Sequence, residues 1–462
     1  MHAALRSLAL ALGLVLAASA IFPAAAQVRP TNPPGGGGGG GSGPSTTPRL
    51  PPGTLLPGLG DGSGPLAGGG GGGGQPQGQG PSDPNLICVV FRAGTPDATS
   101  GDFADAFHLR IEKQFELSGL KLRVFLMRIP DGSNVADVLK EAGVDKRPLW
   151  MQRDLVFRSM QETQSAGSAA GSASSKQYAL QRIRADGLPR AVRGQNVTVA
   201  LIDSGVATRH ESLQGDRIVR VDLVEGGEAP PAETHGTAIA SIIAGSGKVQ
   251  GVAPGISLLA IRAFSEVDPA TGASESDSFR VSQAVSLALD RKARIINLSI
   301  GGPNDPLVRM AVEQAVLTGV VVVAAAGNDG PDAPPVYPAA QTGVIAVTAT
   351  DAKDRIYDGA NRGDYVAIAA PGVDVLAARP GASAGASAYD FFTGTSMATG
   401  YATGLAAVLL SANPKLNAAD LRHILEGSAA DLGPPKKDPE FGWGRIDAAA
   451  ALSETPTVGA AN

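Results

Sequence analysis

The sequence predicts an α/β protein: an open, doubly wound parallel sheet with helices on both faces, preceded by a small α+β module. Three observations predict this class. Beyond Tyr178, apolar runs of five to seven residues alternate with helical patterns, as buried parallel strands and their crossover helices do. Glycine and proline, 61 and 34 of 462 residues, are concentrated before Asn85. The rest of the chain is long enough to bury a large core of its own.

The first 26 residues are typical of a secretory signal peptide. Arg6 supplies a positive charge, Leu8 to Ala18 is an apolar stretch, and Ala24 to Ala26 are small residues suited to cleavage. A membrane anchor is the alternative, but this apolar stretch is shorter than the ~20 residues needed to span a bilayer. We therefore expect a soluble protein, secreted or periplasmic, without a stable membrane anchor.

Two low-complexity segments interrupt the chain. Residues 27–84 are rich in Gly and Pro and include seven-glycine runs at 35–41 and 68–74. This composition buries too little apolar surface to offset its backbone entropy, so we predict a disordered spacer. Residues 162–177, rich in Ser, Gly and Ala, predict a flexible processing tether.

The small module is predicted at residues 85–161. Its pattern indicates strands at Leu86 to Phe91 and Leu122 to Ile129, an extended segment at Leu149 to Phe157, and helices at Phe103 to Leu117 and Ser133 to Ala142. A module of this size folds alone only marginally. Joined by an accessible tether to a larger domain, it suits a removable pro-segment, although an ordinary pair of linked domains has the same composition.

The larger domain is predicted at residues 178–453, with residues 454–462 as a C-terminal tail. Its six strands are nearly continuous apolar runs: Val197 to Ile202, Ser257 to Ala263, Arg294 to Ser299, Val320 to Ala325, Val344 to Ala349 and Tyr365 to Ala369. Its helices are predicted at His235 to Ala244, Asp277 to Lys292, Pro306 to Thr318, Ser396 to Leu410 and Ala418 to Leu425. Ligands of such sheets bind beyond the carboxyl ends of the strands.

Three residues at strand ends and helix starts together suit acyl-transfer chemistry. Asp203 directly follows a strand, His235 begins a helix, and Ser396 begins another helix after Gly394. A serine hydroxyl is too weakly acidic to attack an amide unaided, so it needs a base and a carboxylate that orients the base. Each residue alone could have a purely structural role, such as a helix cap or a position in a surface loop. Their conjunction favours a Ser–His–Asp triad.

The sequence resembles the subtilisin-like serine proteases, or subtilases. The resemblance rests on Val199 to Val206 around Asp203, on His235-Gly-Thr, and on Gly394-Thr-Ser-Met-Ala, which follow each other in the Asp, His, Ser order of that family. It covers about residues 178–452 and implies a subtilisin-like sheet. It also implies a secreted serine endopeptidase that acts on polypeptides and is made as a self-processing zymogen. The module at 85–161 would then be an intramolecular inhibitor.

The resemblance also implies substrate-binding residues. Asn328 matches the asparagine whose side-chain amide helps to form the oxyanion hole. Ser299, Ile300 and Gly301 match the strand that pairs with substrate backbone and walls the specificity pocket. Val336 would lie at the floor of this pocket.

Val336 and a pocket lining without carboxylates predict the specificity. A β-branched side chain is stiff and fills volume, and a charged substrate side chain would lose water without compensation. We therefore expect small to medium uncharged residues, such as Ala, Val, Leu or Met, before the cut bond. The alternative is that Val336 packs in the core and the pocket accepts aromatic residues as well.

The chain departs from the family pattern in three places. Ala238 stands where the family usually has a second His, and Gly400-Tyr401 stands where it usually has Pro-His. The family's calcium loop normally follows the His helix, but residues 244–251 are short here and contain no carboxylate. We expect that no cofactor is required and that no metal serves the site. A structural calcium ion elsewhere is left open.

Other function classes fit the sequence less well. A net charge of −5 without a basic stripe argues against nucleic-acid binding. The motif around Ser396 lacks the second glycine of the α/β-hydrolase nucleophile elbow, and no P-loop or zinc-protease motif is present. The alternative to an active protease is a catalytically inactive subtilisin-fold binding or processing module.

Overall fold

The computed structural model describes residues 83–160, 163–164, 177–213, 217–224, 233–268, 273–380 and 387–456. All of them belong to one compact unit of the chain, Gly72–Asn462. The predicted signal peptide, nearly all of the predicted spacer and most of the predicted tether lie outside the described residues. Among the described residues, no helix combines the length and the apolar character needed to cross a membrane.

The N-terminal module is a four-stranded antiparallel sheet in the order β2-β3-β1-β4, with two helices packed on it. Its core includes edge-to-face contacts of Phe91 with Phe103 and Phe125. The elements are β1 (Leu86–Arg92), α1 (Asp97–Ala106), β2 (Arg110–Leu117), β3 (Leu122–Arg128), α2 (Val135–Ala142) and β4 (Trp150–Arg153). The predicted α+β module is thus present as a compact body.

The predicted helix from Phe103 to Leu117 is wrong. Helix α1 starts earlier, at Asp97, and ends at Ala106, after which His108 takes a positive φ of 55°. The following residues form β2, which pairs with β3 along its length. Apolar residues such as Phe115 fit a helical spacing, but backbone pairing with a neighbouring strand decided the conformation.

The larger domain contains a seven-stranded sheet in the order β16-β15-β14-β12-β7-β9-β8. Every pair in it is parallel, which confirms the predicted fold class. The strands are β7 (Thr198–Asp203), β8 (Ile218–Asp222), β9 (Ser257–Arg262), β12 (Ile295–Leu298), β14 (Val321–Ala325), β15 (Ile345–Thr350) and β16 (Val366–Pro371). Edge strand β8 was not predicted, because it is short, contains Arg220 and Asp222, and has no buried residue that would give it a core-strand pattern.

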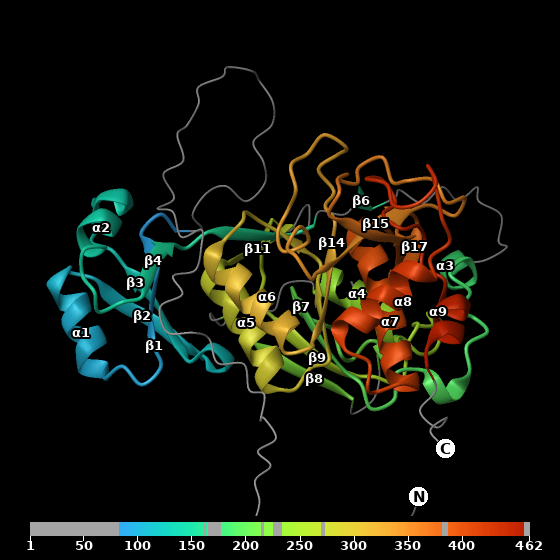
Figure 1. Cartoon of the computed structure of the whole chain (residues 1–462), viewed down its shortest axis with the longest axis horizontal. Coiled ribbons are helices and arrows are strands. Elements are labelled where there is room, and N and C mark those ends of the chain that lie inside the picture. Colours follow the sequence, from blue (N-terminus) through green and yellow to red (C-terminus); the bar gives the residue numbers. More distant parts are fainter. Residues whose placement is uncertain are drawn as a thin grey trace, which may run out of the picture. The chain divides into compact units, whose positions relative to one another are not determined.

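Helices cover both faces of this sheet, with α5 and α6 on one side and α4 and α7 on the other (Figure 1). The central strand β7 shows how the faces divide. Val199 and Leu201 belong to the core beneath α4 and α7, whereas Ala200 and Ile202 belong to the core beneath α5 and α6. The helices of this domain are α3 (Tyr178–Arg182), α4 (Thr234–Ala244), α5 (Ser278–Asp290), α6 (Pro306–Leu317), α7 (Thr395–Ala412), α8 (Ala418–Gly427) and α9 (Ala448–Glu454).

Two small antiparallel sheets connect parts of the chain that are far apart in sequence. The first has the order β10-β11-β5-β13, so that β5 of the N-terminal module lies between strands of the larger domain. The second has the order β17-β18-β6. Their strands are β5 (Val156–Ser159), β6 (Thr163–Gln164), β10 (Ser265–Asp268), β11 (Ala273–Asp277), β13 (Ile300–Gly301), β17 (Val375–Ala378) and β18 (Tyr389–Thr393).

Candidate active site

The structure brings Asp203, His235 and Ser396 together at the carboxyl end of the parallel sheet. Asp203 is the last residue of β7, and His235 and Ser396 are each the second residue of a helix, α4 and α7 respectively. His235 Nδ1 lies 2.7 Å from Asp203 Oδ1, and His235 Nε2 lies 3.1 Å from Ser396 Oγ. All three side chains are buried. They form one continuous chain of hydrogen bonds.

The carboxylate of Asp203 determines the tautomer of His235. An ionised carboxylate only accepts hydrogen bonds, so Nδ1 of His235 carries the proton and Nε2 presents a lone pair to the Ser396 hydroxyl. Asp203 Oδ1 also accepts the backbone N–H of Ser204 at 2.7 Å, which holds the carboxylate in place. In this geometry His235 can take a proton from Ser396.

Close packing requires a glycine at position 236, directly after His235. A Cβ at this position would collide with the carbonyl oxygen of Gly205 and would stand 3.0 Å from Asp203 Oδ1. Helix α4 can therefore begin close to the end of β7 only because residue 236 has no side chain. This close approach brings His235 within hydrogen-bonding distance of Asp203.

Asn328 lies in the loop after β14 (Val321–Ala325) and contacts Thr395, the residue before Ser396. Its Oδ1 accepts the backbone N–H of Thr395 at 2.9 Å and the Thr395 hydroxyl at 2.8 Å. These two bonds orient the amide, with Nδ2 as its other polar end. The N–H of Ser396 lies in the first turn of α7, where backbone donors have no acceptor within the helix. The Asn328 side-chain amide and the Ser396 N–H are therefore the two candidate donors to a developing oxyanion.

Thr395 is a positioning residue that the sequence analysis did not identify, although it stands inside the serine motif. Its hydroxyl also accepts the backbone N–H of Gly327 at 3.3 Å. A second unidentified pair supports the substrate strand: Asn297 Nδ2 donates to Thr403 at 2.8 Å, and Ser299 Oγ donates to Asn297 Oδ1 at 3.2 Å. A polar residue within an apolar strand, as Asn297 is, was the available signal.

The proposed substrate strand β13 is paired, and its partner is the end of the N-terminal module. Strand β5 runs antiparallel to β13, with Ile300 opposite Ser159, and its other edge pairs with β11. Beyond β5, the backbone N–H of Met160 donates to the Ser299 carbonyl at 3.3 Å. The module therefore inserts its last strand between β11 and β13 of the larger domain.

The Met160 side chain lies close to Gly301 and Val336, two of the residues expected to line the specificity pocket. Its side chain is buried, and a Cβ on Gly301 would collide with Cε of Met160 while lying 3.7 Å from Cβ of Val336. Three residues earlier, the ring of Phe157 lies where a Cβ of Gly302 would stand. The two successive glycines thus open space for two apolar side chains of the inserted strand.

The loop of residues 246–250 does not fit a calcium site. It contains no carboxylate, the ligand type that calcium prefers. Gln177 and Gln250 instead exchange two hydrogen bonds of 3.0 Å, and Lys248 Nζ lies 4.4 Å from the centre of the Tyr389 ring. Across the described ranges, no cluster of three or more His, Cys, Asp or Glu residues could hold a metal ion. That no cofactor is required, with a structural calcium ion possible elsewhere, stays a prediction.

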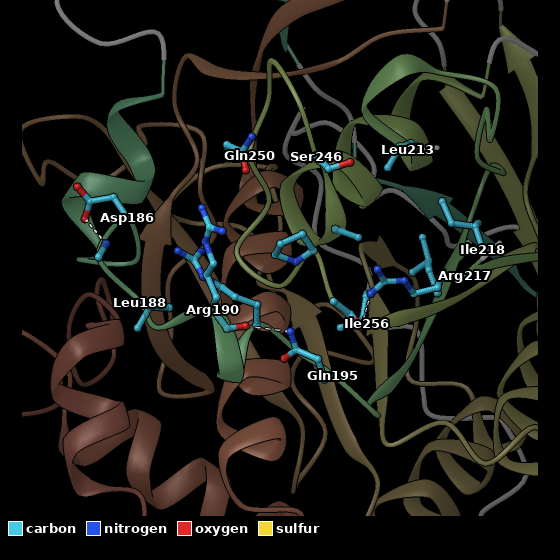
Figure 2. Close-up of a pocket in the computed structure, with 16 residues that line it drawn as sticks. Asp186, Leu188, Arg190, Gln195, Leu213, Arg217, Ile218, Ser246, Gln250 and Ile256 are labelled. Atoms are coloured by element: carbon cyan, nitrogen blue, oxygen red, sulfur yellow. Dashed lines mark hydrogen bonds between the residues drawn. The ribbon is translucent and has the colours of Figure 1, made fainter. Parts of the chain in front are cut away.

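A hollow of about 670 Å³ lies away from the triad, at the amino ends of β8 and β9. Arg190 and Arg217 lie on opposite sides of it (Figure 2). Asp203 is at the carboxyl end of β7, opposite Arg262 at the far end of β9. The hollow therefore lies at the amino ends of the strands, whereas the candidate active site lies at their carboxyl ends.

Comparison with known proteins identifies relatives of the larger domain. A sequence model of the subtilase family, peptidase family S8, matches residues 194–444. Subtilisin DY of Bacillus licheniformis is 33% identical over 266 residues, 55% of this chain and 92% of that protein. Subtilisin E of Bacillus subtilis is 34% identical over 278 residues, 56% of this chain and 68% of that protein.

One relative also matches in three dimensions. Fervidolysin of Fervidobacterium pennivorans is 32% identical over 293 residues, 58% of this chain and 42% of that protein. Its crystal structure, described as that of a keratinolytic enzyme related to subtilisin, superposes with a TM-score of 0.67 at 26% identity. The superposition covers 82% of this chain and 62% of the fervidolysin chain. By sequence, the aligned region spans less than half of the length of fervidolysin.

Proposed function

The chain belongs to the subtilase family, and from this premise we propose that it is a serine endopeptidase acting on polypeptides through Asp203, His235 and Ser396. The observation that carries the proposal is the hydrogen-bonded chain from Ser396 Oγ through His235 to Asp203. In the catalytic cycle, Ser396 Oγ attacks the peptide carbonyl carbon as His235 Nε2 takes its proton. Asp203 holds the imidazolium that forms.

The negative charge of the tetrahedral intermediate falls on the former carbonyl oxygen. The Asn328 amide and the Ser396 N–H are the groups that would stabilise it. His235 then gives its proton to the leaving amine, which breaks the C–N bond and leaves an acyl-enzyme ester on Ser396. Water, deprotonated by His235, attacks this ester and releases the carboxylic acid product.

The N-terminal module is proposed to be a pro-segment that inhibits the site until it is cut. Strand β5 and Met160 use the backbone pairing of a bound peptide, an added strand whose side chains enter pockets. On the far side, Thr163 pairs with Thr393, three residues before Ser396. The described residues on either side of 161–162 thus contact Ser299, at the start of the proposed substrate strand, and Thr393, three residues before Ser396. We assign self-cleavage to the bond after Met160.

The side chain of Met160 sharpens the specificity proposal. A medium-sized, unbranched and uncharged side chain fills the space beside Val336 and Gly301, as the pocket argument predicts. The Phe157 ring against Gly302 adds a second preference, for a large apolar residue three positions earlier. We propose that substrates are cut after Met or similar aliphatic residues. Sequencing the products formed from an unfolded protein mixture tests this, and a dominance of Arg or Lys before the cut would overturn it.

Active-site labelling separates an active protease from an inactive module of the same fold. A serine-directed phosphonate should label the mature chain, and Ser396→Ala should abolish labelling. No labelling of a correctly folded, processed wild-type chain would favour the inactive module. The signal-like residues 1–26 support secretion or export to the periplasm, and fractionation of a cell that expresses the whole chain tests that part of the proposal.

A further inference from the structure

Three acidic residues meet where the pro-segment contacts helices α5 and α6. Asp154 lies between β4 and β5 of the pro-segment, and its Oδ1 accepts the backbone N–H of Phe279, in the first turn of α5, at 3.1 Å. The Cys88 thiol of β1 lies 3.5 Å from the same oxygen. Asp277 and Asp305 are the N-cap residues of α5 and α6. Each helix thus already has a carboxylate of its own at its N-terminus.

Each of the two capping carboxylates accepts several hydrogen bonds, although burial also raises the pKa of Asp305. Asp277 accepts the backbone N–H of Arg280 at 2.6 Å and forms an ion pair with its guanidinium at 3.3 Å. Asp305 accepts hydrogen bonds from Val308 N–H and Ser278 Oγ, and from Nε2 of Gln152 at 2.7 Å. The pro-segment therefore meets Asp305 with a neutral amide, which causes no repulsion.

Asp154 has fewer partners, and all of them are on one of its two carboxylate oxygens. Its side chain is fully buried, no ion pair reaches it in the described part of the chain, and its Oδ2 is buried without a hydrogen-bond partner there. A carboxylate in this position would lose its hydration and face the negative charges of Asp277 and Asp305. Burial, followed by the charge of Asp277, raises the pKa of Asp154 well above its usual range. The neutral acid is the form that this environment tolerates.

We propose that Asp154 binds a proton while the pro-segment is docked, and that loss of this proton loosens the pro-segment from α5 and α6. The inference rests on the proposed function only in treating residues 85–160 as the pro-segment. Because the docked state holds the proton more tightly than the free state, docking is strongest in acid. It weakens as the pH rises from the ordinary aspartate value of about 3.9 toward the raised pKa.

The single cysteine provides a direct measure of this opening. Cys88 is fully buried, in the core cluster that joins the pro-segment sheet to α5 and α6. The test uses the complete Ser396→Ala chain, in which self-cleavage is blocked, and measures the rate at which 4,4′-dithiodipyridine modifies Cys88 between pH 4 and pH 8. The rate in denaturant divided by the rate in the native chain at the same pH is a protection factor, from which the ionisation of the thiol itself cancels.

The protection factor of the Ser396→Ala chain should fall with pH, by up to about tenfold per pH unit, and then level off. Adding Asp154→Asn, which is neutral at every pH, should make the protection factor independent of pH and higher than in the parent at pH 8. Asp145→Asn, which removes a charge paired with Arg147 in the same module, is the matched control and should keep the fall.

Two results would overturn the proposal. One is a protection factor that does not fall with pH, or that falls equally in Asp154→Asn. The other is a loss of protection in Asp154→Asn at pH 4, because a neutral side chain would then not be what the site accepts. The readout needs no peptidase activity, so a failure of the proposed function would appear separately, in the labelling of Ser396.

Discussion

Asp203 and Asp154 are both fully buried aspartates at the end of a strand, yet their surroundings differ. Asp203 pairs with His235 and the Ser204 N–H, whereas Asp154 has one backbone donor, a weak thiol donor and two acidic neighbours. The carboxylate of Asp203 is stabilised by its hydrogen bond with the imidazole of His235. That of Asp154 has no cation beside it in the described part of the chain. Burial and an unpartnered Oδ2 are common to both aspartates in the described part of the chain, so the neighbours of Oδ1 and the nearby charges make the difference.

The same substitution at the two aspartates should separate their roles most strongly. In the mature enzyme, Asp203→Asn should lower kcat by about 10⁴-fold, the size of the effect in serine proteases generally, because the amide no longer fixes the reactive tautomer of His235. Asp154→Asn should leave kcat of the mature enzyme unchanged, because residue 154 leaves with the pro-segment. Steady-state kinetics on a peptide substrate checks both, and equal losses would contradict the comparison.

Ser396→Ala should also cause a large loss of catalytic activity. It should reduce hydrolysis by about 10⁶-fold, the loss known for subtilisin itself, because the nucleophile is absent. The circular dichroism spectrum and Tm should match those of a wild-type chain inhibited by phosphonate. Peptidase activity retained in the purified variant would place the chemistry elsewhere.

Asn328→Ala should have a smaller effect on the same site. Loss of one oxyanion donor costs about 10²- to 10³-fold in kcat, a range taken from subtilisin, with little change in KM because the interaction forms mainly in the transition state. Asn328→Asp is a useful companion because it keeps the size and an acceptor for Thr395 but removes the donor. A rise in KM at unchanged kcat would assign Asn328 to ground-state binding instead.

Met160 tests how far the pro-segment behaves as a substrate. Met160→Lys should slow self-processing at least about a hundredfold, because burying an uncompensated ammonium costs more than the ~1–3 kcal/mol that a methylene contributes in such a pocket. Met160→Leu is the control and should be processed at nearly the wild-type rate. Mass spectrometry of the products over time gives the rate and the cut site. Equal processing of both variants would remove the assignment of the bond after Met160.

The smallest expected effect concerns the loop of residues 246–250. If Lys248 over Tyr389 holds this loop instead of a metal ion, EDTA should leave the Tm of the inhibited enzyme within about 1 °C. Lys248→Ala should destabilise it by about 0.5–1 kcal/mol, as expected for an exposed cation–π contact. Lys415→Ala, another exposed lysine of the same domain, should have no effect. A large fall in Tm on chelation would reveal a calcium site outside this loop.

The parallel sheet and the triad residues could be identified from sequence because their signals are local. Strands buried on both faces are continuous apolar runs whatever their neighbours are, and all six predicted runs overlap strands of the seven-stranded sheet. Asp203 ends one of these strands, and His235 and Ser396 lie in the first turns of helices, all within short motifs. Their residue types and their order along the chain were enough to predict a Ser–His–Asp triad.

Tertiary structure alone decided which distant segments meet. Residues 110–117 became a strand because β3 offered a pairing edge, and β5 joined β11 and β13 across more than a hundred residues of chain. Met160 entered the Val336 pocket, and Asp154 came to lie among Asp277 and Asp305, through the same insertion. Such pairings are not encoded in local periodicity, because a strand's partner and a carboxylate's neighbours come from elsewhere in the sequence. The pKa of Asp154 and the occupant of the pocket therefore depend on the docked fold, whereas the identity of the triad residues does not.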